Sequence, residues 1–282
     1  MVQISRFWKT FRRDKAGLLG ISIIGFFSLL ALFAPLASPY APDATNPNLS
    51  FYAPALSHLL GTDGLGQDVL SRAIYGARVS LIVGFSASGI IVGIGVMVGL
   101  SSGFYGGIID EVLMRLTDFF LVVPSLVLMI IVAAMLGPSL FNVIAIISLL
   151  SWPSTARVVR SMVISLKEWP FVEAAKSSGG GDLYIMLHHL LPNALPVVFA
   201  TGVLSISGAI FSQAALVFLG VGNVTDISWG SMLHDALEFG AISAGYWWVV
   251  VPPGICLVLL ILGFILLGHS LEEIFNPRLR SV

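Results

Sequence analysis

Residues 169–193 read WPFVEAAKSSGGGDLYIMLHHLLPN and form an extended polar interlude between long apolar runs. Pro170 suits the first position of a helix, where its missing N–H costs nothing. Glu173 falls in the first turn, where the helix dipole favours an acidic side chain. Gly179, Gly180 and Gly181 are expected to end that helix, because glycine inside a helix costs about 1 kcal/mol relative to alanine. The stretch therefore predicts a short helix followed by a flexible break.

A second helix is predicted directly after the glycines. Asp182 is placed to cap its start, and Pro192 is expected to close it. Its apolar residues follow the i, i+3, i+4, i+7 spacing of one buried stripe, namely Leu183, Met186, Leu187 and Leu190. The two helices together predict a short helical hairpin between apolar runs, a shape suited to being gripped by another protein.

Composition identifies the class of protein. Of the 282 residues, 57% are hydrophobic and only 10% are charged, and the mean hydropathy is +0.96. Soluble domains average about a quarter charged residues, so the chain is predicted to be an integral membrane protein. The net charge of −1 argues against a nucleic-acid partner, which requires a clustered basic face. The single cysteine, Cys256, cannot form an internal disulfide.

Six membrane spans are predicted, because a span needs about 20 apolar residues. The first, at 16–37, is longer than a signal-peptide core and is expected to remain as an uncleaved anchor. Charged residues at 110–118 mark the boundary before the long run 119–156, and Gly137-Pro138 divides that run into two spans. The other three spans are expected within residues 79–109, at about 194–220 and at about 246–267.

The segments between the spans complete the predicted organisation. A basic amphipathic helix is predicted at 1–15, an external segment at 38–77 and a cytoplasmic tail at 272–282. The other five spans form a core at 78–271, which includes a cytoplasmic loop at 166–193 and an external acidic loop at 221–245. With the N-terminus inside, every Lys and Arg except Arg72 and Arg78 lies on the inner side. The positive-inside rule therefore places both termini and the hairpin in the cytoplasm.

The hairpin resembles the EAA loop of permease subunits of ATP-binding-cassette (ABC) importers. The resemblance lies in Glu173-Ala174-Ala175, in Gly179 six residues after the glutamate, and in Leu191-Pro192. At Gly180, Gly181 and His189 the chain departs from the family pattern, which affects the register of the second helix. In that family the loop forms a coupling helix that docks into a cleft of an ATPase subunit.

Other segments are similar to the C-type permease of the dipeptide/oligopeptide/nickel branch. They are HLLGTDGLGQD at 58–68, SRAIYGARVSL at 71–81, SWGSML at 228–233 and NPRLR at 276–280. The resemblance implies an all-α, six-span, type I ABC importer transmembrane domain in a prokaryotic cytoplasmic membrane. It implies import of di- or oligopeptides, with nickel, oligosaccharide or glutathione as alternative cargoes. An ATP-independent secondary transporter is the remoter alternative.

The same resemblance implies the partners. They are a second homologous permease, two ABC ATPase subunits, an external substrate-binding protein and the lipid membrane. ATP and Mg²⁺ would be bound by the ATPases, so no cofactor is expected in this chain. Neither the phosphate-binding pattern G-x-x-x-x-G-K-[ST] nor a nucleophile elbow occurs in the sequence. The chain is therefore not expected to be an enzyme.

Candidate functional residues follow from the same resemblance. The ATPase-docking set consists of Glu173, Ala174, Ala175, Lys176, Gly179, Asp182 and Pro192. Glu173 is expected to make an ionic or capping contact, and the small alanines would let the helix sit deep in a cleft. Gly179 is expected to serve the turn, and Lys176 is either a rim charge or a solvated side chain.

The charged residues outside the hairpin can each be interpreted as structural or as functional. Arg115 and Asp118, three residues apart, are expected to form a structural ion pair. Arg157 and Arg160 either line an inner vestibule or anchor the membrane boundary. A third group either orders the external segment or contacts a substrate-delivery protein: Asp63, Asp68, Arg72 and Arg78. Adjacent histidines point about 100° apart on a helix, so His188 and His189 are not expected to bind a metal.

Overall fold

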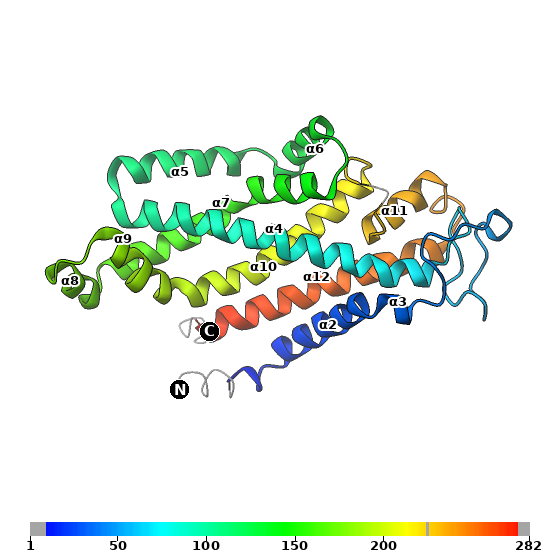
Figure 1. Cartoon of the computed structure of the whole chain (residues 1–282), viewed down its shortest axis with the longest axis horizontal. Coiled ribbons are helices and arrows are strands. Elements are labelled where there is room, and N and C mark those ends of the chain that lie inside the picture. Colours follow the sequence, from blue (N-terminus) through cyan, green and yellow to red (C-terminus); the bar gives the residue numbers. More distant parts are fainter. Residues whose placement is uncertain (1–9, 224–225, 276–282) are drawn as a thin grey trace.

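Long helices make up most of the molecule (Figure 1). In the computed structural model, which describes residues 10–223 and 226–275, five helical segments are long and apolar enough to cross a membrane. They are α2 (Lys15–Leu32), α4 (Val69–Tyr105), α7 (Leu140–Lys167), the unbroken segment Asp182–Phe218, and α12 (Trp247–Phe275). The segment Asp182–Phe218 contains α9 (Asp182–Ile185), the π-helical turn η2 (Met186–Leu190) and α10 (Leu191–Phe218).

The remaining span is a bent pair of helices. α5 (Gly107–Val122) and α6 (Ser125–Leu136) meet at 87°. Pro124 lies at the junction, where its missing N–H and its ring stop the α5 helix. Counting the pair as one span gives the six that the sequence predicts. The start of the third span, predicted near residue 119, is wrong, because α5 begins at Gly107 and contains the charged cluster at 110–118.

Glycines on α4 allow close packing against its neighbours. A Cβ added at Gly99 would lie 2.5 Å from the carbonyl oxygen of Ala156 on α7, and one at Gly95 would lie 2.6 Å from Thr155. A Cβ added at Gly84 would lie 2.9 Å from Ile210 on α10. Small residues of this kind bring helix backbones together in lipid. Gly89 and Gly93 of the same run face open space and take no part in this packing.

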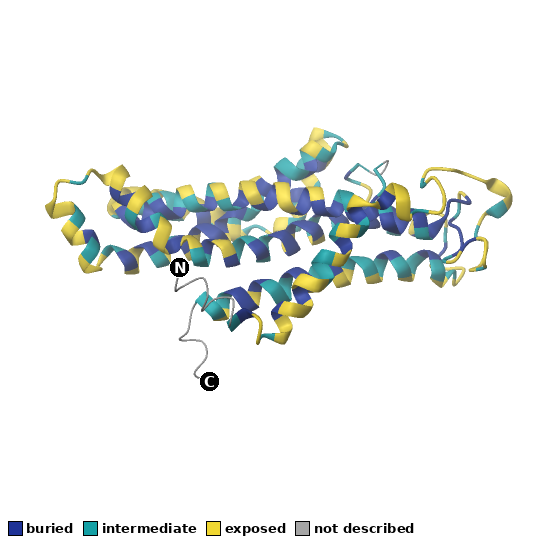
Figure 2. Cartoon of the chain, turned by 60° about the horizontal axis from the view of Figure 1, so that its bottom comes forward, coloured by how far each residue is buried: buried dark blue, intermediate teal, exposed yellow. Residues whose placement is uncertain are grey.

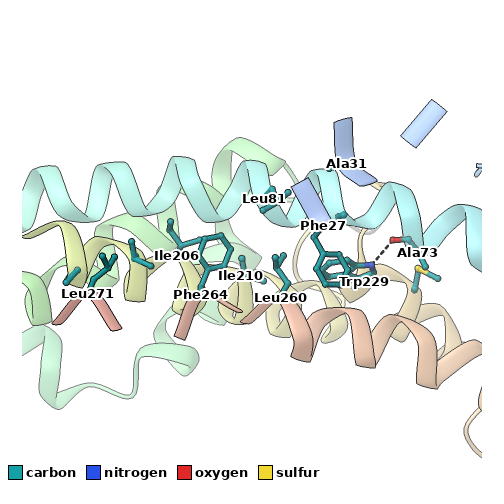
Figure 3. Close-up of a cluster of buried hydrophobic side chains, with 14 of the residues drawn as sticks. Phe27, Ala31, Ala73, Leu81, Ile206, Ile210, Trp229, Leu260, Phe264 and Leu271 are labelled. Carbon is teal, nitrogen blue, oxygen red and sulfur yellow. Dashed lines mark hydrogen bonds between the residues drawn. The ribbon is translucent and has the colours of Figure 1, made fainter. Parts of the chain in front are cut away.

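A hydrophobic core joins α2, α4, α10, α11 (Trp229–Glu238) and α12 around a buried tryptophan (Figure 3). The Trp229 side chain is fully buried, packs edge-on against Phe27 and donates its Nε1–H to the Ala73 carbonyl at 2.9 Å. Nearby, a Cβ added at Gly20 of α2 would lie 2.6 Å from the Gly263 carbonyl oxygen of α12. The first span is therefore packed firmly onto the last.

The short elements gather at the two ends of the bundle (Figures 1 and 2). One end, the hairpin end, carries α8 (Pro170–Ser177) and α9. The opposite end, the α11 end, carries α3 (Ala34–Ala37), the 3₁₀ turn η1 (Pro47–Leu49) and α11. Exposed residues are prominent at both ends, whereas buried ones line the contacts between the long helices (Figure 2).

Several predicted boundaries need correction. α4 begins at Val69, because Asp68 caps it by accepting a hydrogen bond from the Ser71 amide at 2.8 Å, so the segment predicted at 38–77 ends at residue 68. The loop predicted at 221–245 contains α11, whose first turn is held by a capping box of Ser228 and Ser231. α12 runs to residue 275, and most of the predicted tail and most of the amphipathic helix at 1–15 lie outside the described residues.

Candidate functional site

The predicted docking residues lie on the outer surface of the hairpin, residues 169–193. Most of the set is exposed and Ala175 is half-buried; the exposed members are Glu173, Ala174, Lys176, Gly179, Asp182 and Pro192. α8 starts with Pro170 in its first turn and places Glu173 there as well, as the sequence predicts. The side chains that would meet a partner are thus free to do so.

The inner side of the hairpin is anchored in the bundle. Val172 of α8 and Ile185 of α9 are fully buried in a core that includes Phe104 of α4 and Val163 of α7. The ammonium of Lys176 lies 5.6 Å from the centre of the Phe104 ring, within range of a cation–π interaction. The hairpin is therefore packed against α4 and α7 through a shared hydrophobic core.

The glycines form the turn between α8 and α9. Gly179 has φ +82°, a conformation that glycine adopts without strain, and a Cβ there would meet open space. Its amide donates to the Lys176 carbonyl at 2.9 Å, and the next amide donates to the Ala175 carbonyl at 3.0 Å. The turn role predicted for Gly179 fits this geometry.

The second helix of the hairpin differs from the prediction in three ways. Gly181, not Asp182, occupies the N-cap, and Asp182 is the first helical residue without a side-chain cap. Of the predicted stripe, Met186 and Leu190 are buried, whereas Leu183 is 64% exposed and Leu187 45% exposed; Ile185 is buried in their place. The helix is apolar on two faces, so spacing alone cannot select the buried one.

Pro192 does not close this helix, which continues without a break to Phe218. The π-helical turn η2 immediately precedes the proline. A proline ring clashes with the carbonyl one turn back in a regular α-helix, whereas a π-turn widens the helix locally. The wider turn explains how the helix passes through Pro192.

Exposed aromatic and apolar side chains extend the hairpin surface. Tyr184 is 52% exposed and stacks on His188 with ring centres 4.4 Å apart, and Trp169 is 51% exposed. With Leu183 and Leu187 they form an apolar face beside the exposed charges. Helical spacing does not indicate this face, because it places both leucines in the predicted buried stripe.

The ion pair predicted between Arg115 and Asp118 is wrong. Asp118 of α5 accepts a hydrogen bond from Arg157 of α7, and Arg115 lies 3.7 Å from Glu111 on its own helix, both side chains being exposed. A partner 39 residues away along the chain can be found only from the packing of α5 on α7.

A second cross-link joins the same two helices. Arg160 donates from Nε and Nη2 to the two carboxylate oxygens of Asp110, each at 2.6 Å, and Asp110 also accepts from Ser102 of α4. Bidentate arginine–carboxylate pairs are strong and geometrically specific. Arg157 and Arg160 therefore tie the bent span to α7.

The polar residues of segment 38–68 are held in a buried network at the α11 end. Arg72 donates to Asp63 and, at 2.9 Å, to Asp235 of α11. His58 Nδ1 lies 2.9 Å from Asp68. Burial raises the pKa of the Asp235 carboxyl above its usual value; Arg72 offsets part of this, and the nearby charge of Asp63 adds to it. These contacts favour the ordering role predicted for Asp63, Asp68 and Arg72.

Comparison with known proteins places this architecture. The family model described as "binding-protein-dependent transport system inner membrane component" matches residues 95–281, which include α5, α7, the hairpin and α12. The chain belongs to this family of transport permeases. A second model, "N-terminal TM domain of oligopeptide transport permease C", matches residues 3–55 of the permease.

Relatives cover nearly the whole permease. It is 39% identical to a dipeptide transport system permease protein DppC of Alkalihalophilus pseudofirmus, over 97% of this chain and 90% of the relative. It is 35% identical to the DppC of Haemophilus influenzae (99% and 96% covered) and 36% identical to the oligopeptide transport system permease protein OppC of Bacillus subtilis (96% and 88% covered). The chain is therefore a multi-pass membrane permease and not an enzyme.

Proposed function

We propose that this permease is a transmembrane subunit of an ATP-driven importer of di- and oligopeptides. The hairpin carries the proposal: Glu173 and Gly179 are exposed on its outer side, while Val172 and Ile185 fix its inner side in the bundle. An ATPase subunit that grips the hairpin would thus move α4 and α7 with it. The names of the relatives supply the cargo class, peptides.

The direction of the chain in the membrane follows from charge. Cationic side chains gather toward the hairpin end, at Arg157, Arg160, Lys167 and Lys176, whereas the α11 end has a buried Arg72 neutralised by Asp63 and Asp235. By the positive-inside rule the hairpin end is cytoplasmic. Segment 38–68 and α11 then face the external binding protein.

The proposed assembly contains a second, homologous permease and two ABC ATPases that bind ATP and Mg²⁺. Closure of the ATPase dimer draws the hairpins of the two permeases together. Because each hairpin is packed on long helices, the helices rock as rigid bodies and alternate the access of a central pathway. Cargo is released by the external binding protein into the outward-open state.

The experiment uses two glycines with nearly equal positive φ. Gly179 (φ +82°) lies in the hairpin and Gly137 (φ +81°) ends α6, and a Cβ at either meets open space. Both Gly179→Trp and Gly137→Trp are therefore strained by a positive φ without a steric clash of the Cβ. In proteoliposomes holding the whole transporter, Gly179→Trp should abolish peptide uptake and the stimulation of ATP hydrolysis by loaded binding protein, whereas Gly137→Trp should retain both.

Other results would contradict the proposal. Full uptake by the Gly179→Trp transporter would remove the hairpin from the coupling mechanism. Uptake without ATP would favour a secondary transporter. If the purified external protein binds nickel, oligosaccharide or glutathione but no peptide, the coupling mechanism stands and the cargo class is wrong.

A further inference from the structure

A cavity lined by hydroxyl groups lies among α4, α6, α7, α10 and the end of α12. Its volume is about 400 Å³, and the hydroxyls come chiefly from two helices: Ser151, Ser154 and Thr155 on α7, and Thr201, Ser205 and Ser212 on α10. A second cavity of about 460 Å³ shares Ser125, Ser151 and Ser154 with the first and extends to the bend at Pro124. We call this continuous space the hydroxyl groove.

The positions of the hydroxyls give each helix one polar face. Thr201, Ser205 and Ser212 recur at helical spacing on α10, as Ser151, Ser154 and Thr155 do on α7. Between them on α10 stands Gly208, where a Cβ would meet no atom within 4 Å. The groove is therefore unobstructed at position 208.

The groove hydroxyls keep hydrogen-bonding capacity for a ligand. Thr155 is 2% exposed, its side chain contacts the Gly95 position of α4, and its hydroxyl makes no hydrogen bond to any part of the chain that the structure describes. Ser205 and Thr201 donate to carbonyls of their own helix at 2.9 and 3.0 Å, which leaves their oxygens able to accept.

The groove has one charged side chain among the described residues that line it. Glu272 of α12 reaches it from the hairpin end, with one oxygen 3.2 Å from His269 Nδ1 and its side chain 33% exposed. No histidine, cysteine or second carboxylate joins it in the described lining, whereas nickel favours imidazole ligands. The lining therefore suits a neutral polar chain with one cationic group.

We infer that the hydroxyl groove binds the backbone of a peptide in transit and that Glu272 pairs with its N-terminal ammonium. Hydroxyls both donate and accept, so they match the N–H and C=O groups that every peptide carries whatever its side chains. Cavities of about 300–1,000 Å³ suit small ligands. This inference rests on the proposed function and names the residues that hold its cargo.

Adjacent glutamates provide the test of the charge. Glu272 lines the groove, whereas Glu273 is exposed on the same helix outside it. In proteoliposomes with the whole transporter, Glu272→Gln should slow the uptake of labelled trialanine about tenfold, as for loss of a charge-assisted hydrogen bond. Stimulation of ATP hydrolysis by loaded binding protein should stay within about twofold, since coupling is intact.

The control and the opposing outcomes are distinct. Glu273→Gln should retain the uptake of the unmodified transporter. Equal uptake by Glu272→Gln and the unmodified transporter, or equal losses in both glutamine variants, would overturn the role of Glu272. If the unmodified transporter takes up no trialanine or any other peptide, the proposed function fails instead.

A thiol test locates the peptide independently of charge. In a Cys256→Ser background, which lacks cysteine, Ser205→Cys places one thiol in the groove and Phe199→Cys places one on an exposed face of the same helix. A peptide with a thiol-reactive group should label residue 205 only with binding protein and ATP present, and should not show this dependence at residue 199. Uptake of unmodified peptide by the Cys256→Ser transporter without such labelling at residue 205 would overturn the groove as the route.

Discussion

Replacing Arg72 by methionine gives the sharpest test of the α11 end. The side chains of Arg72 and Asp63 are 8% and 6% exposed and that of Asp235 is 19% exposed, so the variant leaves a buried and a partly buried carboxylate without their cation. Unit charges about 4 Å apart attract by about 4 kcal/mol at an effective dielectric of about 20. Breaking a buried pair in this way costs about 3–5 kcal/mol.

Protonation limits the loss and gives it a pH dependence. At pH 7, protonating an ordinary aspartate costs about 4 kcal/mol, since each unit above its pKa of about 3.9 costs about 1.4 kcal/mol. At pH 5 the same step costs about 1.5 kcal/mol. The deficit of Arg72→Met in the free energy of unfolding should therefore be smaller at pH 5 than at pH 7.

The assay is unfolding of the full chain in mixed micelles of mild detergent and dodecyl sulfate, followed by tryptophan fluorescence. Arg115→Met is the matched control, because Arg115 is 79% exposed and its pair with Glu111 should contribute at most about 1 kcal/mol. A loss for Arg72→Met no larger than that of Arg115→Met, or a loss that does not shrink at pH 5, would refute the reasoning.

Three further outcomes are expected from the same assay. Because burial raises the pKa of Asp235, its ionisation disfavours the folded state. Relative to Asp235→Asn, the unmodified chain should therefore lose stability as the pH rises through that raised pKa. Parallel curves of unfolding free energy against pH for the two chains would contradict this. Gly99→Val should destabilise by about 1–3 kcal/mol through its clash with Ala156, whereas Gly89→Val, which faces open space, should be tolerated. Equal effects would contradict the close packing of α4 on α7 at Gly99. Trp229→Phe should lose about 1 kcal/mol with its hydrogen bond, and Trp229→Ala about 3–5 kcal/mol with its packing; similar losses would mean that the ring does not fill the core.

Features that depend on local chemistry could be predicted from the sequence. The apolar runs indicate the spans because backbone groups in lipid must be satisfied within a helix. Pro170 begins α8, and Gly179 provides the turn with its positive φ. Gly137 ends α6 at the predicted break. Each of these signals involves only neighbouring residues.

Features that depend on tertiary packing could not be predicted. Asp118 has Arg115 as a local candidate, yet its partner is Arg157 on α7, because the packing of α5 on α7 brings that cation closer. The helix continues through Pro192 because of a π-turn, which the sequence does not indicate. The hydroxyl groove was missed because serine and threonine within an apolar run satisfy their own helix, and only the arrangement of α7 and α10 reveals a shared face.

The unbroken helix Asp182–Phe218 has a mechanical consequence. Its 37 residues form a rod about 55 Å long at 1.5 Å per residue. Residues 182–193 at its start belong to the hairpin, its middle carries Thr201 and Ser205, and its far end packs on α11. Such a rod acts as a lever arm: a tilt of about 5° at one end displaces the other by about 5 Å over that length. A small tilt of the rod at the hairpin therefore produces a larger displacement at its other end, next to α11.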